Sequence, residues 1–140
     1  FKKGLIWKNI KTGLITIRNK SILNSGSLIN IEAYLKVGGY NERIRLYFSD
    51  FNFIDRYRKR YKEFVVINLV CLHDLSDLTE NDMETVVARF DYYCKDSYNS
   101  AESISDMILL FLTVMLRAIK LTFKFKDLDF LKIFFNTYIK

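Results

Sequence analysis

The chain has 140 residues, of which 50% are hydrophobic, 16% aromatic and 27% charged. This is the length of one domain, too apolar for an intrinsically disordered chain and too charged for a polytopic membrane protein. Its formal net charge is +6, but the charge is unevenly distributed. Residues 1–72 contain 14 basic and 5 acidic residues, residues 73–106 contain 2 basic and 9 acidic residues, and residues 107–140 contain 6 basic and 2 acidic residues. Since a nucleic-acid binder keeps one basic face, and an acidic middle separates the basic ends here, we expect no nucleic-acid partner.

All five glycines lie in the first 39 residues, and proline is absent. Because glycine and proline punctuate turns, this distribution predicts short elements at the front and long helices at the back. We expect residues 1–75 to form a mixed α/β part and residues 76–140 a helical extension packing on it. The first residue is Phe1 rather than Met, so we expect the chain to be a piece of a longer protein.

The front half alternates short apolar runs with polar and glycine-containing turns. Phe64–Leu72 (FVVINLVCL) is nearly continuously apolar and β-branched, which is typical of a buried strand in an α/β core. The other expected elements are strands at Leu14–Ile17 and Ser21–Leu23, a helix at Ile31–Val37 capped by Asn30 and stopped by Gly38, and a helix from Asp50 to Tyr61 with Ser49 as its N-cap.

The back half follows helical spacing throughout. Thr79 and Asp82 resemble a capping box, and an apolar face follows it. On the first helix we expect an apolar face of Met83, Val86, Val87, Phe90 and Cys94. We expect a second helix at Ser103–Phe125. A third helix, capped by Asp127, should present an apolar face of Leu128, Leu131, Phe135 and Tyr138. Two cysteines without a Cys-x-x-Cys motif exclude a disulfide scaffold and a cysteine zinc ribbon, and we expect both to be reduced core residues of a cytoplasmic chain.

Met107–Leu116 is a run of ten residues without a charge, and Arg117, Lys120, Lys124 and Lys126 follow it. The run is too short to span a bilayer, which takes about 20 residues. Two readings stay open: a core helix with a solvated basic end, or an interfacial helix that docks on anionic lipid.

Four clusters carry residues suited to chemistry. They are Asn24–Leu28 (NSGSL), Val37–Glu42 (VGGYNE), Tyr47–Arg56 (YFSDFNFIDR) and His73. A glycine permits close approach of a ligand to the backbone, and an acid that opens a helix is favoured in its ionised form, as a general base requires. Each cluster alone also has an ordinary reading: a turn, a helix stop, a first-turn acid and a structural histidine.

In this order, the four clusters resemble the second half of a family 2 glycosyltransferase, most of all its bacterial rhamnosyltransferase-type branch. The resemblance covers about Ile22 to His73. It implies the acceptor-side half of a GT-A fold, in an enzyme that transfers a sugar with inversion from a nucleotide-sugar to a glycan or lipid-linked acceptor in cell-surface polysaccharide synthesis.

The resemblance also implies the roles of single residues. Asp50 matches the family's general base, and His73 matches a histidine that in some members helps to coordinate the metal on the donor diphosphate. The residues implied in the acceptor and donor pocket are Ser25, Gly26, Gly39, Glu42, Asn52 and Arg56. Ser49 stands where the family usually has an acid, and Asn52 stands where a second Asp is common.

The family binds its nucleotide on an N-terminal half that ends in Asp-x-Asp, and no such motif occurs in the early part of this chain. We therefore expect the nucleotide-sugar and a divalent metal, Mn²⁺ or Mg²⁺, to bind only the full-length enzyme, and this chain alone to bind no metal and to be inactive. We expect self-association of the chain, and peripheral contact with the inner face of the membrane. The alternative is a non-enzymatic α/β or helical interaction module that docks on a membrane surface.

Overall fold

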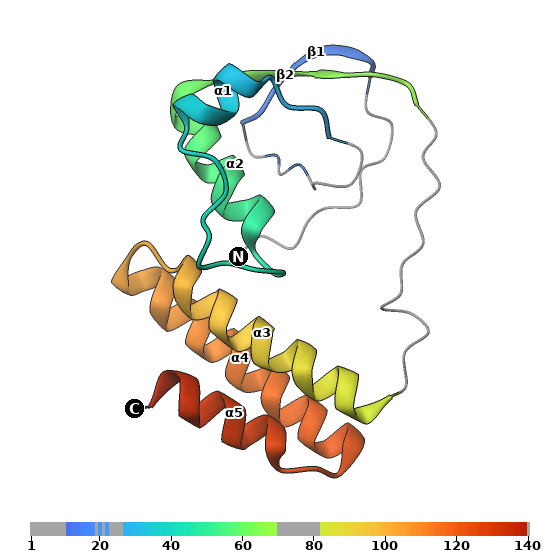
Figure 1. Cartoon of the computed structure of the whole chain (residues 1–140), viewed down its shortest axis with the longest axis vertical. Helices are drawn as coiled ribbons and strands as arrows, with labels where there is room; N and C mark the ends of the chain where they lie inside the picture. Colours follow the sequence, from blue (N-terminus) through green and yellow to red (C-terminus); the bar gives the residue numbers. More distant parts are fainter. Residues whose placement is uncertain (1–10, 19, 21, 23–26, 70–81, 140) are drawn as a thin grey trace. The chain divides into compact units, whose positions relative to one another are not determined.

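The computed structural model describes residues 11–18, 20, 22, 27–69 and 82–139, and within these the chain is a mixed α+β protein (Figure 1). Its elements in chain order are β1 (Gly13–Thr16), α1 (Ile31–Lys36), α2 (Ser49–Arg60), β2 (Glu63–Val66), α3 (Met83–Ser100), α4 (Ile104–Phe125) and α5 (Asp129–Tyr138). The chain divides into two compact units. The sheet unit comprises Phe1–Asn41 and Asp50–Asp74, and the helical unit comprises Glu42–Ser49 and Leu75–Lys140.

The division at residues 74 and 75 lies next to the boundary expected from the sequence. The segment Glu42–Ser49 differs from that expectation, because it groups with the helices although it precedes α2 in the chain.

The sheet unit contains an antiparallel pair of strands in which Leu14 lies opposite Val65 and Thr16 opposite Glu63. The pairing continues beyond the strands, where the N–H of Ile17 donates to the carbonyl of Lys62 at 2.8 Å. Strand β1 confirms the strand expected at Leu14–Ile17, one residue earlier. Of the strand expected at Ser21–Leu23, only Ile22 lies within the described residues, and it is not in a strand.

The apolar run that begins at Phe64 is not a buried strand over its described part, residues 64–69, and this corrects the sequence-based expectation. Strand β2 ends at Val66, and the side chains of Val65, Ile67 and Leu69 are exposed. Successive residues of a strand face opposite sides of a sheet. Phe64 packs against the core of the sheet unit, so Val65 points to the other side. The run therefore has one covered face instead of two.

Helix α2 supplies most of the core of the sheet unit. Phe53 and Ile54 are buried together with Ile17 and Val37. Helix α1 begins as expected: the side chain of Asn30 accepts the N–H of Ala33 at 3.1 Å, which satisfies one of the donors left open at a helix start.

Helix α3 begins with Asp82, whose carboxylate accepts the N–H of Thr85 at 2.9 Å. Asp82 is thus the N-cap itself and not the third residue of a capping box, while Thr79 lies outside the described residues. The expected apolar face is confirmed, since Phe90 and Cys94 are buried and Met83, Val86 and Val87 pack against the same core.

Helix α4 confirms the helix expected at Ser103–Phe125, and the hydroxyl of Ser103 caps it by accepting the N–H of Asp106 at 3.1 Å. Helices α3, α4 and α5 pack against one another (Figure 1). Their shared core consists of Phe90, Cys94, Val114, Ala118, Phe130 and Phe134.

The buried face of α5 agrees only in part with the expected one: Leu131 and Tyr138 pack against the core as expected. Phe130 and Phe134 are fully buried, whereas Leu128 and Phe135 are exposed. The turn before α5 places Lys126 in the left-handed region, with φ at 55°. The side chain of Asp127 accepts the N–H of Asp129 at 2.8 Å, so α5 begins at Asp129. Phe130 packs against the ring of Phe90 on α3, and Phe134 packs against the ring of Phe111 on α4, so both phenylalanines face the core.

Within the part of the chain that the structure describes, no helix is both long enough and apolar enough to cross a membrane.

Candidate functional site

The candidate site is built on α2, which carries Asp50 in its first turn. Asp50 is partly buried, and its Oδ1 atom is fully buried. Partial positive charge at a helix N-terminus favours the ionised form of a carboxylate there. Asp55, one turn further along α2, is instead an exposed residue whose carboxylate pairs with Arg58 at 3.0 Å. The two acids of one helix therefore lie in different environments.

Asn52 follows Asp50 by two residues and is 9% exposed. Its side-chain oxygen is buried and has no hydrogen-bond partner among the described residues. A buried polar atom without a partner costs about 1–3 kcal/mol.

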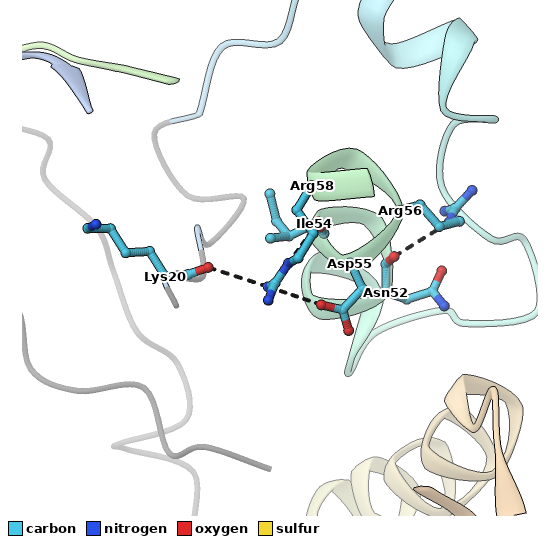
Figure 2. A network of polar contacts seen from close by, with 6 residues as sticks. All are labelled: Lys20, Asn52, Ile54, Asp55, Arg56 and Arg58. Carbon is cyan, nitrogen blue, oxygen red and sulfur yellow. Dashed lines mark hydrogen bonds and ion pairs between the residues drawn. The ribbon is translucent and has the colours of Figure 1, made fainter. Parts of the chain in front are cut away.

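Arg56 ties α2 to the paired glycines that follow α1. Its guanidinium donates to the carbonyl of Val37 at 3.0 Å, of Gly38 at 3.3 Å and of Gly39 at 2.6 Å. Figure 2 shows that Arg56 and Arg58 leave α2 on opposite sides: Arg58 extends toward Lys20, whose carbonyl it meets at 3.4 Å. Arg56 thus holds the glycine turn in place through hydrogen bonds from its charged guanidinium group to three successive carbonyls.

The glycine turn needs glycine for two reasons. Gly38 and Gly39 have φ values of 82° and 62°, in a region that residues other than glycine rarely adopt. A Cβ at Gly39 would also lie 3.0 Å from the hydroxyl of Tyr34. That hydroxyl accepts the N–H of Tyr40 at 3.1 Å, and the rings of Tyr34 and Tyr40 pack against Phe53 of α2.

Two of the four sequence clusters are thereby brought together in the sheet unit. Gly39 of the second cluster contacts Arg56 of the third, and Asn52 lies one turn before Arg56 on α2. Glu42 belongs to the helical unit, where it is exposed. Ser25, Gly26 and His73 lie outside the described residues, as does Cys71.

Asp96 of α3 is a buried acid that the sequence did not single out. It is 1% exposed, and its carboxylate accepts three successive backbone N–H groups, from Arg45 at 2.9 Å, Leu46 at 2.8 Å and Tyr47 at 2.7 Å. Hydrogen bonds to an ionised acceptor are about twice as strong as neutral ones. This carboxylate therefore fixes the segment Glu42–Ser49 to α3 within the helical unit.

Aromatic packing fixes the same segment at its end. The rings of Tyr47 and Phe48 lie 5.3 Å and 5.1 Å from the ring of Tyr93. Phe48, which immediately precedes α2, has φ at 65°, and a side chain in that region costs about 1–2 kcal/mol. The guanidinium of Arg117 on α4 lies over the ring of Tyr93, 4.3 Å from its centroid. Burial raises the pKa of Tyr93, and the charge of Arg117 opposes that rise.

Cys94 is a free thiol buried in the helical core. Desolvation raises its pKa to about 12, so the thiol is protonated at neutral pH and serves as a small apolar residue. Among the described residues, no three His, Cys, Asp or Glu side chains are grouped as ligands for a metal ion.

Comparisons of the chain with known protein families, with characterised proteins and with solved structures find no match.

Proposed function

We propose that the chain is the acceptor-side half of an inverting glycosyltransferase of the family 2 type, with a GT-A fold, and that Asp50 is its general base. One observation supports this most directly. The helix that presents Asp50 in its first turn also carries Arg56, which binds Gly39 seventeen residues earlier in the chain. Two motifs of the family resemblance therefore meet on one helix of the sheet unit.

In the proposed reaction, a hydroxyl of the acceptor attacks the anomeric carbon of the donor sugar. Asp50 takes the proton of that hydroxyl as the new C–O bond forms, and the bond to the donor diphosphate breaks, so the nucleoside diphosphate leaves with the electron pair. A carboxylate in the first turn of a helix suits this role, because a general base takes up a proton and a helix N-terminus is a favourable place for negative charge. Asn52, two residues after Asp50 on the same helix, adds an amide oxygen that has no hydrogen-bond partner among the described residues.

The substrates proposed for the full-length protein are a nucleotide-sugar donor and a glycan or lipid-linked acceptor. A divalent cation that binds the donor diphosphate, with His73 as one ligand, belongs to the same proposal. The chain's own contribution is the acceptor side: a base, a turn held by Arg56, and a buried amide.

The test is Asp50→Asn in the full-length gene product, assayed for sugar transfer against a panel of nucleotide-sugars with Mn²⁺ or Mg²⁺ present. We expect turnover to fall about 10²–10⁴-fold, which is the usual contribution of a general base. Stability should change little, since a first-turn carboxylate contributes about 0.3–1 kcal/mol.

Asp55→Asn is the matched control. It removes an exposed acid from the same helix, together with an ion pair to Arg58, and turnover should stay close to that of the unchanged protein. Full turnover in Asp50→Asn, with normal folding, would show that Asp50 is not the base.

A further inference from the structure

Helix α4 carries a second apolar face that its packing in the helical unit does not use. Its exposed members are Ile108, Leu112, Leu116, Ile119 and Phe123, with Leu116 64% and Phe123 79% exposed. At 3.6 residues per turn these five fall within about 80° of the helix circumference. We call them the outer stripe.

The opposite side of α4 is the core side. Leu110, Val114 and Ala118 are buried there, one turn apart. The uncharged run Met107–Leu116 therefore has two sides: Leu110 and Val114 enter the core, whereas Ile108, Leu112 and Leu116 face outward. A core helix alone would have polar residues in the outer stripe.

Positive charge borders the outer stripe along one edge. Lys120 lies one turn after Leu116 and Lys124 one turn after Lys120, and both are exposed. Arg117 is turned to the other side, over Tyr93. The one acid of α4, Asp106, is engaged at the helix start, where it accepts the hydroxyl of Ser103 at 2.6 Å.

We propose that the outer stripe and its lysine edge dock on an anionic lipid bilayer, with α4 lying in the plane of the interface. The apolar stripe enters the boundary between headgroups and acyl chains, while Lys120 and Lys124 meet anionic headgroups. Lipid fits this face better than nucleic acid, because the larger part of the face is apolar. The inference is independent of the glycosyl-transfer proposal.

The test is flotation of the 140-residue chain with vesicles of pure phosphatidylcholine, and with vesicles that also contain phosphatidylglycerol. We expect co-flotation with the anionic vesicles, and a decline as salt is raised, because salt screens exposed charges. A glycosyltransferase assay is not part of this readout, so failure here leaves the proposed base untouched.

Two double variants separate the apolar and the electrostatic parts. Lys120→Gln with Lys124→Gln should lower partitioning about 25-fold, since each basic residue near an anionic surface contributes about fivefold. Leu116→Ser with Phe123→Ser should lower it by about tenfold or more for each side chain. All four residues are exposed, so circular dichroism should report unchanged helix content.

The matched control is Leu35→Ser with Lys36→Gln on α1. Both residues are exposed, so the variant removes an apolar side chain and a charge without touching α4, and partitioning should be unchanged. Equal recovery with neutral and anionic vesicles, or recovery with neither, would overturn the proposal. So would a stable dimer in light scattering that the Leu116→Ser and Phe123→Ser variant dissociates, because a second copy would then cover the stripe.

Discussion

The carboxylate of Asp96 accepts the backbone N–H of Tyr47 at 2.7 Å, across 49 residues of sequence. The same carboxylate also holds the N–H groups of Arg45 and Leu46. A side chain that binds three successive main-chain donors acts on the backbone irrespective of the side chains there. The course of this segment is therefore set by a residue of α3.

Replacing Asp96 by Asn should destabilise the helical unit by about 2–4 kcal/mol. The amide keeps one acceptor oxygen but loses the charge, and its NH₂ group faces main-chain donors that are left without a partner. Urea unfolding measures the loss, and hydrogen exchange at residues 45–47 should accelerate. Asp91→Asn, on the same helix, removes only an ion pair with Lys95 and should cost about 0.5 kcal/mol or less. Equal losses in the two variants would contradict the assigned role of Asp96.

Arg56→Lys should destabilise the sheet unit by about 1–3 kcal/mol. A lysine ammonium has no planar fork and does not reach the carbonyls of Val37, Gly38 and Gly39 together, so a buried acceptor is left unpaired. Thermal unfolding is the measurement. Arg58→Lys is the control on the opposite side of α2. It perturbs an exposed pair and should cost less than about 1 kcal/mol.

Gly39→Ala should cost more stability than Gly38→Ala. Both substitutions place a side chain at positive φ, which costs about 1–2 kcal/mol. Only at Gly39 does the new Cβ approach another side chain at 3.0 Å, namely the hydroxyl of Tyr34, whereas at Gly38 the nearest atom is 3.4 Å away. Chemical denaturation of the two variants compares them directly, and the reverse order would show that the ring of Tyr34 moves aside freely.

The helical unit should lose stability in alkali. Burial raises the pKa of Tyr138 from 10.0 to about 12, and its hydroxyl lies 2.6 Å from that of Ser97. Because the folded pKa is the higher one, the unfolded chain ionises first. The contribution of the raised Tyr138 pKa to the free energy of unfolding is complete below pH 10 and is lost as the pH rises toward 12. Cys94 adds to this loss of stability from pH 9 upward, because burial raises its pKa from 9.0 to about 12 and its thiol also ionises first in the unfolded chain.

Unfolding curves recorded across this pH range test the assignment. Tyr138→Phe removes one titrating group, so its stability should decline less steeply between pH 10 and 12 than that of the unchanged chain. It should also be lower at neutral pH, because the contact with Ser97 is lost. An unchanged slope would mean that Tyr138 does not titrate on unfolding in this range.

The sequence by itself determined the helices and the starts of α1 and α4. Ser103 and Asn30 cap helices where their side chains can accept a nearby N–H, and Phe90 and Cys94 follow the spacing of one helix face. These are local signals: a cap and its donor lie within one turn, and an apolar face repeats every three or four residues. They need no knowledge of distant parts of the chain.

Tertiary structure alone decided which contacts the residues of the candidate site make. The sequence placed Arg56 on the correct helix but did not show that its guanidinium donates hydrogen bonds to the carbonyls of a glycine turn. It did not single out Asp96. On α5 it was right about Leu131 and Tyr138, which pack against the core, and wrong about Leu128 and Phe135, which are exposed. The physical reason is the same for both charged residues. Their partners are backbone carbonyl and N–H groups, which every residue except proline carries in the same form, so no pattern of side chains marks them.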